Sequence, residues 1–516
     1  RRGDVAVDDE FRSTYVVGGA LDYRGADVRL SLDVAYQRYK VTQLRTKVAL
    51  GGLTAIPRVP RASANYSQAF SYSTLRDVFG TVKGEWDVSE NAMLYASFGA
   101  RDGSERGIYD GITVTDATTG AATGSALFVP AATNNEAAQA GIRVKLAQGG
   151  ISHEINLGGA ANWQVFRTAY NFLGGFDGFA TNLYATPQVA LPGPAGDVIG
   201  GDLDDPFPIT RTRLFSAFAS DTIGLFDDRV LISGGLRLQR LQNKGYSYFG
   251  GGLTSNYETD AVTPVVGLVV KPVAGVSLYA NRVEALTAGD IAGASFTTAI
   301  GAVLPISNAG QALSATKSKQ YEVGAKFTSG RFNASIAAFT TDRPLSFARP
   351  DPNRPGTAIF ARFGKQRNRG IELSVDGELT EGLRVIAGGS IIDAALRETG
   401  TPALDGNDAF GVPKYLANAN VEYDLPFAPG LTLTGRMVHT GRQAVDAANT
   451  LRLNDWTRFD VGARFVAAVA ERPLTLRIGM DNVANRRYWA SSFDGFTPQL
   501  LQGAPRTYRA SASIDF

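Results

Sequence analysis

Apolar and polar residues alternate along most of this chain, and this pattern constrains the fold more than any other feature. The C-terminal stretch shows it most clearly, with Tyr508, Ala510, Ala512, Ile514 and Phe516 alternating with Arg509, Ser511, Ser513 and Asp515. The same alternation runs through 28–36, 320–327, 371–376 and 474–481. A period of two residues is typical of β-strands with two different faces, and no stretch keeps a helical period for long. The sequence therefore predicts an all-β chain.

The length of the alternating runs distinguishes between soluble and membrane folds. The expected strands span about 12–15 residues, compared with about 5–6 in soluble sheets, and this length suits tilted strands that cross a bilayer. Their polar face is rich in glycine and in charges of both signs, as expected of a water-filled lumen. The alternative is a soluble sandwich, or a propeller with repeats of about 40–50 residues, and no such repeat appears. The pattern favours a transmembrane antiparallel β-barrel.

The connections between the expected strands alternate strictly between tight turns and long loops. Outer-membrane barrels have short periplasmic turns and longer extracellular loops. The tight turns are expected at 25, 87–90, 149–150, 225–228, 272–274, 329–331, 378–382, 425–429 and 468–472. The long loops are expected at 41–71, 104–134, 167–209, 244–257, 287–316, 344–363, 396–411, 444–454 and 488–502. We therefore expect the tight turns on the periplasmic side of the membrane and the long loops on the extracellular side.

Nineteen strands lie between these connections. They are expected at 13–24, 26–40, 72–86, 91–103, 135–148, 151–166, 210–224, 229–243, 258–271, 275–286, 317–328, 332–343, 364–377, 383–395, 412–424, 430–443, 455–467, 473–487 and 503–516. Bacterial single-chain barrels have an even number of strands. We therefore expect residues 1–516 to be one barrel domain that lacks its first strands, with about 19 strands present of a probable 22.

Composition excludes several classes of function. The net charge of +2 is too small for a nucleic-acid-binding surface, and without cysteine the chain has no disulfide, thiolate nucleophile or Cys/His zinc site. No apolar run approaches the roughly 18 residues of a spanning helix. His153 and His439 stand on separate expected strands, and no catalytic constellation accompanies them, so we do not expect an enzyme. Asp202, Asp204 and Asp205 in an outer loop are either solvated or oxygen ligands for a divalent cation.

Five segments, in order along the chain, carry a family likeness. They are Ser318-Lys319-Gln320-Tyr321-Glu322-Val323-Gly324-Ala325-Lys326, Arg367-Asn368-Arg369-Gly370-Ile371-Glu372, Gly411-Val412-Pro413-Lys414, Asp481-Asn482-Val483-Ala484-Asn485-Arg486-Arg487-Tyr488-Trp489, and Gly503-Ala504-Pro505-Arg506 with the terminal Phe516. On these residues the chain resembles the barrel of TonB-dependent receptors, in the ferric-siderophore branch. The resemblance covers about 12–516, and the plug domain and TonB-contacting motif of that family are not among these residues.

The resemblance implies a function for the full-length protein. It would be an active transporter in the outer membrane of a Gram-negative bacterium, importing a ferric siderophore with energy supplied through TonB. The iron would arrive already chelated, so no cofactor or protein metal site is expected. The other expected partners are outer-membrane lipid and the barrel-assembly machinery, which would read Phe516; no nucleic acid is expected, and the barrel would be a monomer. The alternatives are a passive porin-like channel, or TonB-dependent uptake of heme, cobalamin or a glycan.

The outer loops hold more aromatic residues and arginine than solvation requires. Aromatic faces suit a bulky, partly apolar chelate, and arginine can offset the negative charge of many ferric siderophores. The candidate ligand-binding residues are Tyr109, Tyr246, Tyr248, Phe249, Phe347, Arg349, Trp489, Phe493 and Phe496. The alternative roles are packing between loops and anchoring at the membrane interface. For Tyr488 and Trp489 we expect a place in an interfacial aromatic girdle.

Overall fold

The computed structural model describes residues 2–297, 303–469, 472–493 and 497–514, and every regular element in these ranges is a β-strand. No helix of the described residues is both long enough and apolar enough to cross a membrane. Nineteen long strands make one wall: β2(Phe11–Arg24), β3(Val28–Thr42), β5(Tyr72–Ser89), β6(Ala92–Val114), β7(Ala121–Gln148), β8(Ile151–Thr168), β12(Pro208–Leu225), β13(Val230–Tyr246), β14(Leu253–Val270), β15(Val276–Thr287), β18(Thr316–Ser329), β19(Phe332–Pro350), β20(Ala358–Thr380), β21(Leu383–Arg397), β22(Tyr415–Asp424), β23(Leu431–Thr440), β26(Trp456–Val469), β27(Arg472–Asp481) and β30(Thr507–Ile514). Both the all-β barrel class and the count of about 19 strands are confirmed.

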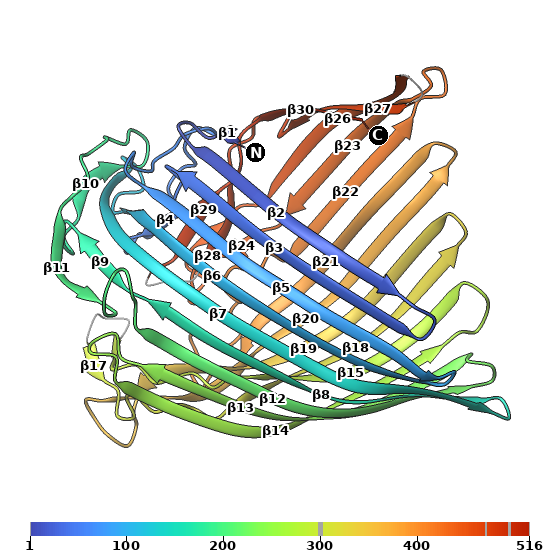
Figure 1. Ribbon diagram of the computed structural model, residues 1–516. Helices are drawn as coiled ribbons and strands as arrows, with labels where there is room; N and C mark the ends of the chain where they lie inside the picture. Colours follow the sequence, from blue (N-terminus) through green and yellow to red (C-terminus); the bar gives the residue numbers. More distant parts are fainter. Residues whose placement is uncertain (1, 298–302, 470–471, 494–496, 515–516) are drawn as a thin grey trace.

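Each long strand pairs antiparallel with the next long strand along the chain, from β2 to β30. The strands run obliquely around a curved wall, with large loops at one end and tight turns at the other (Figure 1). Within the described ranges no ladder joins β2 to β30, so the wall has an open side between its two edge strands. These residues do not test the expectation of a closed barrel of 22 strands, which stays a prediction.

The short strands lie in the outer loops, apart from β1, which pairs with β2. They are β1(Arg2–Asp4), β4(Val48–Leu50), β9(Tyr170–Leu173), β10(Phe179–Asn182), β11(Pro194–Ile199), β16(Ser295–Thr297), β17(Val303–Pro305), β24(Gln443–Ala444), β25(Arg452–Leu453), β28(Trp489–Phe493) and β29(Gln499–Gln502). Most of them extend the main sheet beyond the strand ends, whereas β16–β17 and β24–β25 form separate hairpins. The loop end is therefore itself folded structure.

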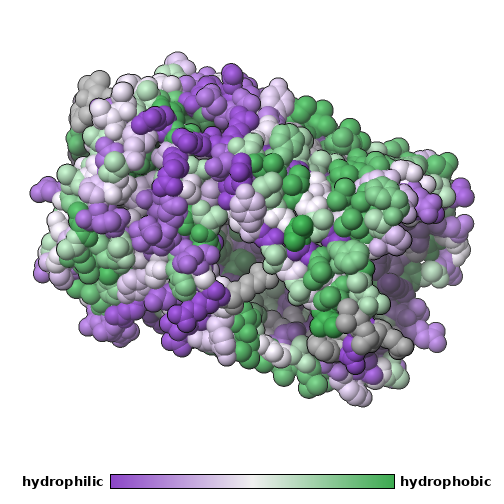
Figure 2. All heavy atoms as spheres, turned by 90° about the horizontal axis from the view of Figure 1, so that it is seen from above, coloured by the Kyte–Doolittle hydropathy of each residue, from purple (hydrophilic) through white to green (hydrophobic). Residues whose placement is uncertain are grey.

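The two faces of the wall differ as the alternation predicts. In the ladder between β27 and β30, Ile478 lies opposite Ala510, and Arg477 lies opposite Ser511 on the other face. The apolar face is exposed, with Leu21 at 68% and Ile478 at 65% of full accessibility, which is typical of a surface covered by lipid rather than by protein. Figure 2 shows apolar residues gathered over the strands, a mainly hydrophilic loop end at the left, and a hollow between the walls.

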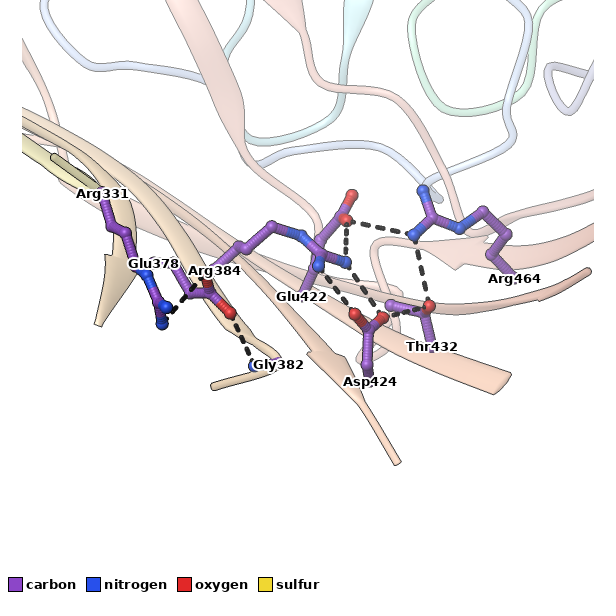
Figure 3. Close-up of polar contacts among 8 residues, drawn as sticks. All are labelled: Arg331, Glu378, Gly382, Arg384, Glu422, Asp424, Thr432 and Arg464. Atoms are coloured by element: carbon purple, nitrogen blue, oxygen red, sulfur yellow. Dashed lines mark hydrogen bonds and ion pairs between the residues drawn. The ribbon is translucent and has the colours of Figure 1, made fainter. Parts of the chain in front are cut away.

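The polar face carries charge networks that link neighbouring strands. Near the tight turns, the Arg384 guanidinium donates to Asp424 Oδ2 at 2.7 Å and to Glu422 Oε2 at 3.2 Å. Thr432 Oγ1 donates to Asp424 Oδ1 at 2.6 Å, and Arg464 lies 3.6 Å from Glu422 (Figure 3). These residues come from β21, β22, β23 and β26. Hydrated charges of both signs on this face identify it as the lumen side of the wall.

Two outer loops differ from the expectation. The sequence predicts strands ending near 103 and resuming near 135, but β6 and β7 continue as one hairpin in which Tyr109 lies opposite Leu127. The loop at 344–363 is likewise mostly paired, with Ala348 opposite Phe360. Hydrogen-bond ladders do not stop at the membrane boundary, because backbone pairing needs no lipid. The end of an apolar pattern therefore does not mark the end of a strand.

The register of β30 generates a test. Ala510→Asp places a carboxylate on the apolar face opposite Ile478, whereas Ser511→Asp places it beside Arg477 in the lumen. A Lys or Arg at the membrane midplane costs roughly 2–4 kcal/mol and an Asp less. We expect Ala510→Asp to lower the fraction of heat-modifiable folded barrel on cold gels, and Ser511→Asp to leave it near wild type. Equal losses for the two variants would show that the faces are assigned wrongly.

Candidate ligand-binding site in the outer loops

The outer loops pack around a small hydrophobic core of their own. The buried residues are Val48, Leu50, Tyr66, Ile112, Val114, Ala122, Leu183, Val445, Leu451, Leu453, Trp489 and Leu500. They come from the first loop, the β6–β7 hairpin, the loop before β12 and the last two loops. A second cluster, around Ala292, Ile306 and Ala358, joins the loops on either side of β18 and β19. The loop surface that meets a ligand is therefore held on packed structure.

The first and last outer loops meet across the open side of the wall. β29 pairs with β4, with Leu500 opposite Val48. The Arg45 guanidinium donates to the carbonyls of Ala62 at 2.8 Å, Gln502 at 3.1 Å and Gly503 at 2.8 Å. Trp489 Nε1 donates to the Pro57 carbonyl at 2.9 Å. Except for the bond to Ala62, which lies within the first loop, these contacts join segments that are more than four hundred residues apart in the chain.

The segment 481–489 builds the turn that carries the last loop. Asn482 is 1% exposed; its side-chain amide donates to the carbonyls of Arg486 and Ala504, and its Oδ1 accepts the Arg486 N–H. Tyr488 stacks on Trp456 with ring centroids 4.3 Å apart. Tyr488 and Trp489 are buried, at 6% and 5% exposure, so the expectation of an interfacial girdle is wrong for both. The packed last loop removes these rings from the membrane interface.

The predicted Tyr246 ends β13, and Tyr248 and Phe249 follow it in the loop to β14. The Tyr248 ring lies 5.6 Å from that of Tyr170, and the Arg211 guanidinium lies 5.5 Å from the Tyr246 ring. Phe249 is 76% exposed at the tip of the loop. The Tyr248 carbonyl also accepts the Gly200 N–H at 2.9 Å, which ties this loop to the one before β12. Exposed rings on a fixed backbone suit contact with a bulky ligand.

The other predicted site residues fall into separate places. The Tyr109 hydroxyl donates to the Glu105 carboxylate and lies 2.8 Å from Ser73 Oγ. The Phe347 ring lies 5.3 Å from that of Phe363, and the Arg349 guanidinium lies 3.7 Å from the same Phe363 ring. These contacts do not bring the predicted residues together into one site.

Two of the predicted residues in the last loop have aromatic or charged partners. Trp489 belongs to the loop core, and the Phe493 ring lies 4.3 Å from Lys47 Nζ. Phe496 lies outside the described residues. Phe493 is partly exposed, whereas Trp489 is buried and its Nε1 donates to Pro57 of the first loop.

Three aromatic residues that were not predicted belong to the group at Tyr248. The Tyr170 and Phe172 rings lie 5.7 Å apart, and the Phe172 and Phe176 rings lie 4.3 Å apart. Phe176 is 83% exposed. Tyr170 and Phe172 are two residues apart, which is the spacing of side chains on one face of a strand. This spacing could have indicated the short strand β9 and its two rings. We define Tyr170, Phe172, Phe176, Tyr246, Tyr248 and Phe249 as the aromatic group.

The acidic and histidine candidates for other chemistry have ordinary partners. Asp204 pairs with Arg106 at 2.7 Å and its N–H bonds Asp202 Oδ1 at 2.6 Å. His153 Nδ1 lies 2.8 Å from Asp221 Oδ2, and His439 Nδ1 lies 2.9 Å from Thr457 Oγ1. In the part of the chain that the structure describes, no group of His, Asp and Glu is arranged to hold a metal ion.

Asp110 anchors the first loop through its carboxylate. It accepts hydrogen bonds from Ser67 Oγ at 2.8 Å and from the Gln68 N–H at 2.6 Å. Burial raises the pKa of Asp110 above its ordinary value, and these hydrogen bonds only partly oppose that effect. Because the folded chain holds this proton at higher pH than the unfolded chain, the contribution of Asp110 to loop stability falls as pH rises from its unfolded pKa through its folded pKa.

The fold and its loops define a class of protein. A wall of nineteen long antiparallel strands with an apolar exposed face, tight turns at one end and packed loops at the other is an outer-membrane β-barrel of the large receptor type. Residues 20–483 match the family model described as "TonB dependent receptor-like, beta-barrel". The chain belongs to the TonB-dependent receptor family, whose members are receptors of the Gram-negative outer membrane rather than enzymes. The predicted family and location are confirmed.

Comparison with individual proteins agrees with this assignment. The chain is 38% identical over 516 residues to the ferrichrome receptor FcuA of Yersinia enterocolitica, covering 100% of this chain and 66% of that protein. It is 27% identical over 269 residues to the metal-pseudopaline receptor CntO of Pseudomonas aeruginosa, covering 51% of this chain and 35% of the relative. The crystal structure of BauA, the ferric preacinetobactin receptor of Acinetobacter baumannii, matches with a TM-score of 0.87 and 28% identity, over 100% of this chain and 74% of that one.

The contacts of Arg45 generate a second test. Arg45→Ala leaves buried carbonyls of the first and last loops without their donor, and hydrogen bonds to a charged group contribute about 1.5–3 kcal/mol each. We expect the first loop to become sensitive to protease in intact cells, with the barrel still folded. Arg58→Ala, on the exposed surface of the same loop, is the control and should leave cleavage near wild type. Unchanged protection in Arg45→Ala would contradict the role of this residue.

Proposed function

We propose that the full-length protein binds a ferric siderophore at its outer loops and imports it across the outer membrane with energy supplied through TonB. One observation carries the proposal: the chain aligns from end to end with a receptor named for ferrichrome. The aromatic group supports it, because the exposed rings of Phe176 and Phe249 and the half-buried rings beside them are of the kind that a partly apolar chelate contacts. Iron would enter as part of the chelate, so the barrel needs no metal ligands of its own.

The proposal includes the partners expected from the sequence. Surface binding would require only the loops. Translocation would also require the TonB complex, because TonB would supply the energy for moving the chelate through the lumen of the barrel. The apolar face of the wall would contact outer-membrane lipid, and the barrel would act as a monomer. Phe516, which lies outside the described residues, would be read by the barrel-assembly machinery. Residues 1–516 would be the barrel domain of the protein.

A passive porin remains the alternative to test. Porins have 16–18 strands and leave an open channel, whereas this wall already has nineteen strands and folded loops at one end. A receptor for heme, cobalamin or a glycan would share the fold and differ only in its ligand. The two tests below separate these cases.

The dependence on TonB is measured by the uptake of labelled ligands. Cells expressing the full-length protein are given a panel of iron-loaded siderophores, with heme, cobalamin and a glycan as alternative ligands, in the presence and absence of TonB. We expect surface binding in both strains and uptake of a ferric siderophore only with TonB. Uptake that continues undiminished without TonB would favour the porin.

The ligand contacts are measured with truncated rings. Tyr246→Ala and Tyr248→Ala should each weaken binding several-fold, since a lost aromatic contact costs on the order of 1 kcal/mol. Phe427→Ala is the control, because this ring is 83% exposed in a tight turn at the opposite end of the wall. Trp489→Ala should weaken binding only together with protease sensitivity of the loops, since its ring packs in their core. Normal binding by both tyrosine variants would refute the aromatic group as the contact surface.

A further inference from the structure

A cavity of about 390 Å³ lies where the first outer loop, the loop before β12 and the last loop meet. Arg58, Arg61, Asn65, Tyr184 and Arg487 are among its lining residues. The volume falls within the range of about 300–1,000 Å³ that is typical of small-molecule sites. Three arginines around one cavity make its chemistry distinct from that of the aromatic group.

The charges of this arginine pocket are only partly balanced. Arg61 pairs with Asp8 at 2.6 Å and donates to Ser63 Oγ at 2.8 Å. Among the described residues, no carboxylate lies within ion-pair distance of Arg58 or Arg487. The Asn65 amide is occupied, since it donates to the carbonyls of Asp8 and Gln43. Two of the arginines that line the pocket therefore carry a positive charge that no described carboxylate balances.

The Arg58 guanidinium is held in position by a neighbouring ring, and the backbone on either side of Arg487 is anchored. The Arg58 guanidinium lies 4.2 Å from the centre of the Tyr184 ring, and the Tyr184 hydroxyl donates to the Ala117 carbonyl at 3.1 Å. Arg487 stands between Arg486, whose backbone is bonded to Asn482, and the buried Tyr488. A planar guanidinium fixed on a ring loses less entropy when it binds a carboxylate or phosphate in two-pronged geometry.

We propose that the arginine pocket binds an oxyanion group, a carboxylate or a phosphate, carried by the incoming ferric chelate. This inference rests on the proposed function and narrows it to chelates that keep a negative charge outside the iron centre. Two unbalanced arginines attract such a ligand and discriminate against its neutral analogue. In this proposal the arginine pocket binds the negative charge of the chelate, and the aromatic group contacts its apolar surface.

The test uses the full-length receptor in detergent and a matched pair of ligands. One is a ferric trihydroxamate with a free carboxylate, and the other is its methyl ester. We expect wild type to bind the acid about tenfold more tightly than the ester, as for one hydrogen-bonded charge contact. Arg58→Gln and Arg487→Gln should each weaken binding of the acid several-fold and leave the ester unchanged. The control is Arg486→Gln, which removes the same charge from a side chain bonded to the Thr457 and Asp455 carbonyls.

Several outcomes would overturn the assignment of the pocket. They are equal affinity of wild type for acid and ester, an equal loss in Arg486→Gln and Arg487→Gln, or an equal loss for both ligands in the pocket variants. Inorganic phosphate should compete with the acid but not with the ester. Displacement of phosphate by purified lipopolysaccharide, with no displacement by the acid, would assign the anion to lipid and overturn the chelate as its source. TonB-dependent uptake of the ester at the same rate as the acid would overturn the pocket while leaving the proposed transport intact.

Discussion

Backbone hydrogen bonding inside the bilayer is the constraint on which the rest of the structure depends. Lipid offers no partner for a peptide N–H or carbonyl, so each strand in the wall must pair with its neighbours along its whole span. Eighteen successive antiparallel ladders join the strands from β2 to β30, and within the described ranges no ladder joins these two strands to each other. The register then sends each side chain to lipid or to the lumen, which is why Ile478 and Arg477 can be neighbours in sequence and lie in opposite environments.

Above the membrane the same chain follows different rules. Water can hydrogen-bond to unpaired backbone groups there, so the loops need not form continuous ladders. They pack instead around apolar residues such as Val114 and Leu500. Tyr184, which holds Arg58, packs against this core, and the contact between the Tyr170 and Tyr248 rings joins two further loops. The loops are held to one another through contacts such as that between Trp489 of the last loop and Pro57 of the first.

Local patterns predicted the wall well because its determinants are local. Alternation identified all nineteen strands, and Gly149-Gly150, both with positive φ, marked a tight turn correctly. The loops were predicted poorly because their determinants are distant in sequence. Nothing near Trp489 indicates that the first loop covers it, and nothing near Tyr170 indicates that Tyr248 stacks beside it. Residue type alone could propose aromatic ligands, but it could not sort core rings from exposed ones.

The Arg45 contacts also indicate the order in which parts of the chain fold. Arg45 bonds to Gln502 and Gly503, which follow it by 457 and 458 residues. Closing so long a loop early in folding would carry a large entropic cost, so the contact forms after the intervening strands have already paired. The hydrogen bonds from Arg45 to Gln502 and Gly503 therefore indicate that the strands between them have folded. Protease resistance of the first loop thus becomes a single marker of completed assembly.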